Sequence, residues 1–128
     1  MNLTQNTDAA LRESEMLYRS LIETTQTGFV ILSATDGTVL DANLTYVAMT
    51  GRKTLEEVRG HTVLEWTAPW DSERNEREVQ LCFETGVVRN LVIDYIHPDG
   101  TVVPVEINAN AHETSRGRVI QTLVRDGA

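Results

Sequence analysis

The stretch that decides the fold runs from Leu91 to Ala111 and reads Leu-Val-Ile-Asp-Tyr-Ile-His-Pro-Asp-Gly-Thr-Val-Val-Pro-Val-Glu-Ile-Asn-Ala-Asn-Ala. Two runs rich in β-branched and aromatic residues flank a turn sequence, His97-Pro98-Asp99-Gly100. Proline fixes φ for a turn, and glycine supplies the positive φ that closes it. In the second run Val103, Val105 and Ile107 alternate with polar residues, which is typical of a strand with one buried face. We therefore expect an antiparallel hairpin at the heart of a sheet.

The first run of this hairpin is apolar on both faces. Leu91, Ile93 and Tyr95 share one face, while Val92 and Ile96 lie on the other. Exposed apolar surface of this kind is normally covered by another element or by a partner. We therefore expect something to cover the back of the hairpin.

The bulk properties indicate one globular domain. The chain has 128 residues, 41% of them hydrophobic and 23% charged, with a net charge of −8 and a pI near 4.8. An acidic balance argues against nucleic acid or an anionic membrane as the direct partner. No apolar run approaches the ~20 residues of a membrane span, and no signal peptide is visible. Cys82 has no second cysteine to pair with, so we expect a soluble, cytoplasmic protein.

The N-terminal region predicts a helix with an apolar stripe. Residues 1–8 are polar and are expected to be frayed, and Asp8 can cap the helix that follows. The stripe could pack on the sheet of its own domain or form a two-helix dimer seam with a second copy, and the sequence supports both. Its members are Ala9, Ala10, Leu11, Leu17, Tyr18, Leu21 and Ile22.

The next segment predicts two strands and a short helix. Residues 28–33 and 38–41 are apolar runs joined by Asp36-Gly37, a strong hairpin signal. Asn43 can then cap a short helix that Gly51 ends.

The middle of the chain predicts further helical pieces. Residues 54–58 begin with a capping box, Thr54 to Glu57, and residues 61–70 are loop-like with two indoles that we expect to be buried. Asp71-Ser72 open a longer helix that ends at Gly86. We expect its polar side at Glu73, Glu76 and Glu78 and its buried end at Val79, Leu81, Cys82 and Phe83.

The order of these elements defines the fold class. A turn over residues 113–118 and a last alternating strand over 119–125 follow the main hairpin. The sequence therefore predicts an α+β fold with a five-stranded antiparallel sheet, short helices on one face and an N-terminal flanking helix.

Six fragments along the chain resemble one known family. They are Leu17-Tyr18-Arg19-Ser20-Leu21-Ile22; Gly28-Phe29-Val30-Ile31 with Asp36 to Asn43; Met49-Thr50-Gly51; Glu57-Val58-Arg59-Gly60; Asp99-Gly100-Thr101 with Val105-Glu106; and Val124-Arg125-Asp126. In this order they resemble the PAS domain, or sensory box, the input domain of bacterial signalling proteins such as sensor histidine kinases. The likeness spans residues 15–126, which leaves 1–14 as a flanking segment and 127–128 as the start of a linker.

The resemblance implies a regulatory module in a two-component or similar signal transduction system. Such domains sense a small ligand or a partner contact, form homodimers and control an attached output domain. A histidine kinase is the first candidate for that output, and a diguanylate cyclase or transcription regulator is an alternative. A second alternative is a dimerisation or docking module with a filled core and no ligand. This chain itself is not expected to be an enzyme.

Two cofactors of the family are disfavoured by the residues that stand here. Val63 occupies the position of the cysteine that binds flavin in the light-sensing branch, and Tyr95, Val105 and Val124 stand where that branch has amides. The haem branch uses a histidine on the long helix, and residues 71–86 contain none.

The histidines give no metal site either. His61, His97 and His112 lie in a linker, a turn and a strand end, without the spacing of a zinc cluster. We therefore expect no metal and no cofactor, which leaves an unidentified small molecule as the candidate ligand.

Two groups of residues are candidates for function. The ligand pocket between sheet and helices is predicted at Val30, Leu32, Asn43, Tyr46, Val47, Val79, Phe83, Ile93, Tyr95, Val105, Ile107, Thr122 and Val124. The same residues could instead fill a close-packed core. The dimer interface is predicted at Leu11, Leu17, Tyr18, Leu21, Ile22, Val92 and Ile96.

No catalytic constellation stands out. Asp94 and Glu106 could pair across the hairpin, but both are assigned to the outward face. A triad of Ser33, His61 and Asp41 lacks the Gly-x-Ser-x-Gly motif that exposes a nucleophile. Cys82, on the apolar side of its helix, is interpreted as a core residue.

Overall fold

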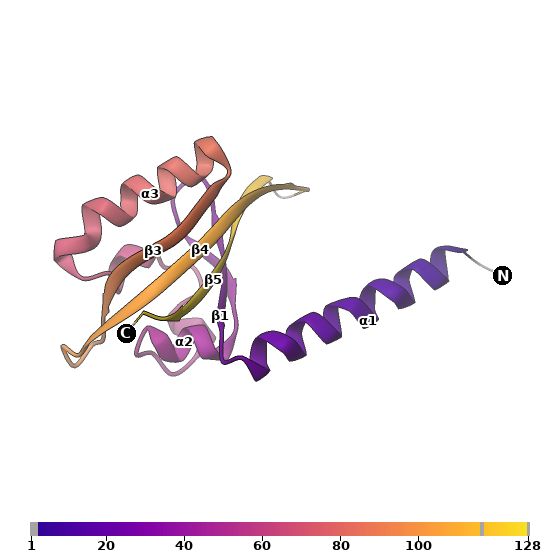
Figure 1. Ribbon diagram of the computed structural model, residues 1–128, viewed down its shortest axis with the longest axis horizontal. Coiled ribbons are helices and arrows are strands. Elements are labelled where there is room, and N and C mark those ends of the chain that lie inside the picture. Colours follow the sequence, from indigo (N-terminus) through magenta and orange to yellow (C-terminus); the bar gives the residue numbers. More distant parts are fainter. Residues whose placement is uncertain (1–2, 116, 128) are drawn as a thin grey trace.

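The computed structural model describes residues 3–115 and 117–127 (Figure 1). Between α2 and α3 lie three short 3₁₀ helices, η1 (Leu55–Glu57), η2 (Val63–Glu65) and η3 (Pro69–Asp71). The other elements are, in order, α1 (Leu3–Thr24), β1 (Gly28–Ser33), β2 (Val39–Ala42), α2 (Leu44–Met49), α3 (Ser72–Thr85), β3 (Val87–Ile96), β4 (Val102–Thr114) and β5 (Gly117–Asp126).

The sheet has five strands in the order β2-β1-β5-β4-β3, and every neighbouring pair is antiparallel. The predicted hairpin is confirmed as β3 and β4, with Ile93 opposite Val105 and a turn closed by Gly100 at φ +90°. Its predicted place at the heart of the sheet is wrong, because β3 forms an edge and β5 occupies the centre. The first hairpin attaches to the last strand, a pairing that order along the chain does not reveal.

The free edge of β3 is covered by the segment that precedes α3. The backbone N–H of Ala68 donates to the carbonyl of Asp94 at 2.8 Å, and that of Ile96 donates to the carbonyl of Trp66 at 2.8 Å. The Arg74 guanidinium donates to the Val92 carbonyl at 2.6 Å. These bonds use the polar groups of an edge that would otherwise offer a template for another strand.

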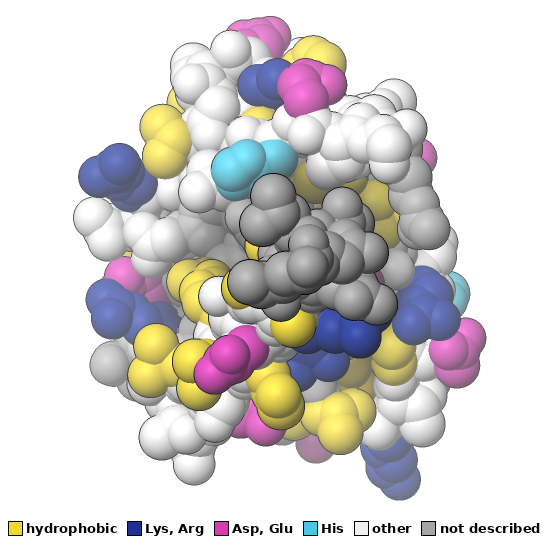
Figure 2. Space-filling model, turned by 90° about the vertical axis from the view of Figure 1, so that its right-hand side faces the viewer, with side chains coloured by type: hydrophobic (Ala, Val, Ile, Leu, Met, Phe, Trp, Pro, Cys, Tyr) yellow, Lys and Arg dark blue, Asp and Glu magenta, His cyan; other side chains and the backbone are white. Residues whose placement is uncertain are grey.

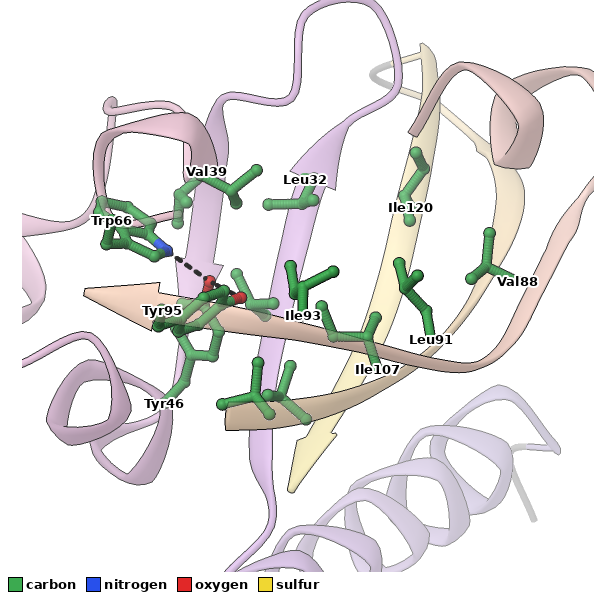
Figure 3. Packing of buried hydrophobic residues seen from close by; sticks show 14 of the residues in the cluster. Leu32, Val39, Tyr46, Trp66, Val88, Leu91, Ile93, Tyr95, Ile107 and Ile120 are labelled. Atoms are coloured by element: carbon green, nitrogen blue, oxygen red, sulfur yellow. Dashed lines mark hydrogen bonds between the residues drawn. The ribbon is translucent and has the colours of Figure 1, made fainter. Parts of the chain in front are cut away.

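The helices between β2 and β3 cover one face of the sheet, as predicted (Figure 1). The core lies between these two layers, and Figure 3 shows its side chains converging from the strands and from the helical segment. Its largest fully buried side chains are Trp66, Tyr46 and Tyr95.

Local sequence signals set the element ends where they were expected. Asn43 caps α2 by accepting from the backbone N–H of Tyr46 at 2.9 Å. Thr54 and Glu57 form the predicted capping box, and Gly86 ends α3 in the left-handed conformation, with φ of +93°.

Three expectations about element bounds were wrong. Helix α1 begins at Leu3, so residues 3–8 are helical and Asp8 is no cap, since no glycine or proline interrupts the segment. Strands β4 and β5 continue to Thr114 and Gly117, because Glu113 and Arg118 face each other and form an ion pair at 2.7 Å. The loop over residues 61–70 contains η2 and the start of η3.

Burial on the helical side also differs from the expectation. Trp66 is fully buried, but Trp70 is 61% exposed and its indole donates to the Asp94 carboxylate at 2.8 Å. Leu81 and Phe83 are exposed as well. The face of α3 that turns to the sheet instead carries Asn75, Glu78, Val79 and Cys82, of which the last three lie three, four and seven residues after Asn75.

Helix α1 projects away from the sheet (Figure 1). Of its apolar stripe only Ile22 is buried, whereas Leu11, Leu17, Tyr18 and Leu21 are each more than half exposed. The stripe as a whole therefore does not pack on the sheet of its own domain.

Candidate functional site

A small cavity lies between α3 and the sheet. It has a volume of about 30 Å³, and its wall is mostly apolar. The lining residues are Val30, Leu32, Tyr46, Val63, Asn75, Glu78, Val79, Cys82, Val88, Leu91, Tyr95, Ile107, Ala109, Ile120 and Thr122. Since a water molecule needs about 10–15 Å³ of such space, the cavity is small beside ordinary ligand pockets.

The predicted pocket residues lie in different places. Those on the cavity wall are Val30, Leu32, Tyr46, Val79, Tyr95, Ile107 and Thr122. Val47, Ile93, Val105 and Val124 are buried in the core away from the wall. Phe83 is exposed beneath the guanidinium of Arg118, which lies 5.6 Å from the ring centre.

Asn43 has a structural role that uses its whole side chain. Its Oδ1 accepts from the backbone N–H groups of Phe29 and Tyr46, both at 2.9 Å, and its Nδ2 donates to the Thr27 carbonyl at 3.0 Å. The side chain therefore joins the start of α2 to the start of β1 and does not line the cavity.

Three aromatic residues form a hydrogen-bonded cluster (Figure 3), and two of them, Tyr46 and Tyr95, line the cavity. The indole N–H of Trp66 donates to the Tyr46 hydroxyl at 2.9 Å, and this hydroxyl lies 3.0 Å from that of Tyr95. The Tyr46 ring meets both other rings edge-to-face, with centroids 6.4 and 6.2 Å apart. The cluster therefore ties α2, the residue after η2 and the edge strand β3 together.

Both phenols are held in the neutral form. Burial raises the pKa of Tyr95 to about 12. The pKa of Tyr46 is raised well above its usual range by burial and by the neighbouring Tyr95. These hydroxyls therefore act as hydrogen-bond groups and not as bases near neutral pH.

The polar groups on the helix side and on the sheet side of the cavity differ in whether they have hydrogen-bond partners. The Asn75 amide on α3 donates to the Thr67 hydroxyl at 3.0 Å, and Thr67 donates to the Val63 carbonyl at 2.8 Å. On the sheet wall, Thr122 of the central strand is buried, and its hydroxyl has no hydrogen-bond partner among the described residues. A buried hydroxyl without a partner is uncommon and costs free energy.

The positions at which flavin-binding domains carry a cysteine and amides have apolar or phenolic side chains in this chain. Val63, at the position of that cysteine, is buried in η2 on the cavity wall. The cysteine of this chain, Cys82, lies on a different element, α3. The thiol pKa of Cys82 is raised by burial.

The histidines have other roles. His61 contacts Glu65 at 3.0 Å, and the Nε2 of His97 donates to the Met49 carbonyl at 2.9 Å. Among the residues whose side chains are described, no three His, Cys, Asp or Glu gather as a metal site.

The carboxylates and hydroxyls considered for catalysis have separate partners. Asp94 accepts from Trp70, whereas Glu106 pairs with Arg125 at 2.6 Å. Asp41 lies 3.7 Å from Arg59 and not beside a histidine. These contacts do not assemble a catalytic group.

The surface around α1 combines apolar and amide side chains. A groove of about 280 Å³ runs between Tyr18 and the outer face of the sheet, where it is lined by Phe29, Asn108, Gln121 and Leu123 among others. Figure 2 views the molecule from the side on which α1 projects and shows hydrophobic side chains grouped among charged ones. Val92 is exposed and Ile96 half-buried on β3.

Sequence reasoning placed Val79 of α3 at the pocket and Cys82 on the buried side of the helix, but it missed Asn75 and Glu78. These two share one helical face with Val79, and this spacing could have placed them together. The polar character of Asn75 and Glu78 concealed their position, because a buried helix face is expected to be apolar.

The comparisons with known proteins agree with this geometry. The family described as PAS fold matches residues 17–126. The chain therefore belongs to the PAS family, whose members are sensory modules. No curated protein matches it. No helix in the described part of the chain has the length and hydropathy needed to span a membrane.

Solved structures show the same fold. The PAS domain of an HTR-like protein from Haloarcula marismortui is 22% identical, with a TM-score of 0.67 over 95% of this chain and 98% of that one. A PAS domain from Colwellia psychrerythraea is 20% identical, with a TM-score of 0.71 over 87% and 95%. A domain of a sensory box sensor histidine kinase/response regulator from Geobacter sulfurreducens is 24% identical, with a TM-score of 0.70 over 91% and 96%.

Proposed function

We propose that this chain is a cytoplasmic input module that binds a small ligand in the cavity beneath α3, dimerises, and relays the signal to an attached output domain. The cavity carries the proposal, because its wall includes the Thr122 hydroxyl, which is buried without a partner. A histidine kinase is the first candidate for the output, supported by the similar domain of a sensory box sensor histidine kinase/response regulator from Geobacter sulfurreducens. Neither nucleic acid nor a membrane surface is a partner in this proposal, since the chain carries a net charge of −8.

The ligand is neither flavin nor haem in this proposal. A cavity of about 30 Å³ is far too small for either ring system. Val63 has no thiol to form an adduct, and no residue of α3 is a histidine. The purified protein should therefore be colourless.

The relay requires that the ligand favour one of two arrangements of the domain. The segment from Asn43 to Thr67 is the part that moves, because it contributes only isolated bridges to the sheet, such as Thr38 with Thr62. Its shift reaches both ends of the domain through β1 and β5, which pair directly, with Gly28 opposite Val124. The helix α1 precedes β1, and the exit of the chain follows β5.

The dimer contact is the exposed stripe of α1. Leu11, Leu17, Tyr18 and Leu21 lie within three turns of the helix and are open to solvent. Packing two such helices together would remove this surface from water at a gain of roughly 25 cal/mol per Å². Ile22 stays with its own domain, since it is buried there.

Light scattering tests the dimer. Removal of residues 1–20, or the pair Leu17→Glu and Leu21→Glu, should halve the mass in solution. Leu44→Glu is the matched control, because Leu44 is also exposed on a helix but lies on α2. An unchanged dimer mass in the α1 variants would exclude this seam.

Native mass spectrometry of the freshly purified chain tests the ligand. Excess mass per chain that Thr122→Val lowers would support a sensor with an occupied cavity. A bare polypeptide mass that no added small molecule changes would favour the second candidate, a dimerisation or docking module with a filled core. The small volume of the cavity is the observation that supports this second candidate.

A further inference from the structure

The aromatic cluster has one hydrogen-bond donor that its own oxygens do not accept. Trp66, Tyr46 and Tyr95 bring one N–H and two O–H groups, and two hydroxyls can form only one hydrogen bond with each other. The indole N–H donates to Tyr46, and one phenol hydrogen forms the bond between the two phenols. The remaining phenol hydrogen has no acceptor among the described residues, although both rings are buried on the cavity wall. The cavity therefore has a free donor.

A second free donor lies on the sheet wall. The side chain of Thr122 is 4% exposed, and its hydroxyl meets no partner in the described chain. Thr122 sits on the central strand, opposite Val30 and Ala109, which also line the cavity. Neither neighbour offers a side-chain acceptor. Two hydroxyl groups that line the cavity, one phenol and Thr122, therefore have no hydrogen-bond acceptor within the described chain.

The surroundings select against charge in whatever fills this space. Burial raises the pKa of both phenols, which shows that this region disfavours a negative charge. The carboxylate of Glu78 is also on the wall and would repel an anion. A cationic amine would be attracted to Glu78, but it has no lone pair to accept from the free hydroxyls. The chemistry that satisfies them is an uncharged acceptor.

We propose that the ligand of this cavity is a small, uncharged molecule with a hydrogen-bond acceptor, of the class of short aldehydes, ketones and amides. This inference rests on the ligand-sensing function proposed above. The carbonyl oxygen accepts from the free phenol hydrogen or from Thr122, and the rest of the molecule lies against Leu91, Ile107 and Ile120. About 30 Å³ admits roughly two to three non-hydrogen atoms as the chain stands. A slightly larger molecule needs more room, which the segment from Asn43 to Thr67 provides by moving, since Tyr46 and Val63 of this segment line the cavity.

Three nearly isosteric probes separate the chemical classes. Propionamide is neutral, propionate is an anion and propylammonium is a cation, and each is titrated into the isotope-labelled protein at the same concentrations. The readout is the indole N–H resonance of Trp66, identified by its persistence in Trp70→Phe. We expect propionamide to shift this resonance saturably and the two ions to leave it unchanged.

Three variants test the donors. Thr122→Val, Tyr95→Phe or Tyr46→Phe, according to which hydroxyl the carbonyl uses, should weaken propionamide binding about fivefold, the loss of one net hydrogen bond. Thr35→Val, in an exposed turn, is the control and should leave it unchanged. Equal binding by the wild type and by all three variants would overturn the inference.

The remaining outcomes separate this inference from the proposed function. Saturation by propionate or propylammonium in place of propionamide would overturn the ligand class and leave ligand sensing intact. No saturation by any probe, together with a bare mass in native mass spectrometry, would overturn both.

Discussion

We expect Thr122→Val to stabilise the ligand-free protein. Thr122 is buried on the central strand β5, between β1 and β4, and its hydroxyl makes no hydrogen bond within the described chain. Valine has nearly the same shape and is β-branched, so it keeps the strand conformation and the packing. The substitution therefore removes an unpaired polar group and little else.

The magnitude follows from the cost of that group. A buried hydroxyl without a partner costs about 1–3 kcal/mol relative to a paired one. Because the cavity admits a water molecule that could recover part of this cost, we expect the lower end, a gain of about 1 kcal/mol in the free energy of unfolding. For a domain of this size that corresponds to a rise in Tm of about 4 °C.

Thr50→Val is the matched control. Thr50 is also fully buried, but its hydroxyl donates to the Val47 carbonyl at 2.6 Å. Loss of that bond should destabilise the chain by about 1 kcal/mol, so the two variants should move in opposite directions in urea denaturation. If Thr122→Val is destabilised as much as Thr50→Val, its hydroxyl has a partner in solution and the reasoning is refuted.

Three further predictions concern the turn, the cap and the phenols. Gly51→Ala should cost at least about 2 kcal/mol in thermal denaturation, because its Cβ would lie 2.5 Å from the His97 ring at a φ of +79°. Gly100→Ala is the control, since Gly100 has a φ of +90° but open space around the added Cβ, and it should cost only about 1 kcal/mol. Equal costs for the two variants would contradict the argument. Asn43→Ala should cost about 2 kcal/mol in urea denaturation, while Asn43→Asp keeps the cap and should lose less. Since the folded chain raises the pKa of Tyr95 to about 12, its contribution to stability is complete below pH 10 and is lost as the pH rises towards 12, by about 3 kcal/mol. Tyr95→Phe should flatten this alkaline decline, and an unchanged slope would show that Tyr95 does not cause it.

The parts of the fold that sequence predicted are those that local chemistry determines. The turn before Gly100, the cap at Asn43 and the end of α3 at Gly86 each depend on a few adjacent residues. The alternation along β4 also placed Val105 and Ile107 on the buried face. Such signals act over a few residues and are visible in one sequence.

Features that depend on distant contacts were not predictable in this way. The exposed position of Trp70 follows from its bond to Asp94, on a strand that begins well after it in the chain. The position of β3 at an edge follows from the pairing of β1 with β5. The polar wall of α3 went unrecognised because Asn75 finds its partner, Thr67, on another segment.

The place of β5 in the sheet also governs how the domain can be made. The first hairpin, β1 and β2, joins the other strands only through β5, which spans Gly117–Asp126. A ribosome must therefore deliver nearly the whole domain before the sheet can close, and until then the inner edge of β1 is unpaired. Folding is consequently late during synthesis, and the nascent domain is exposed to misassociation through that edge until its final residues emerge.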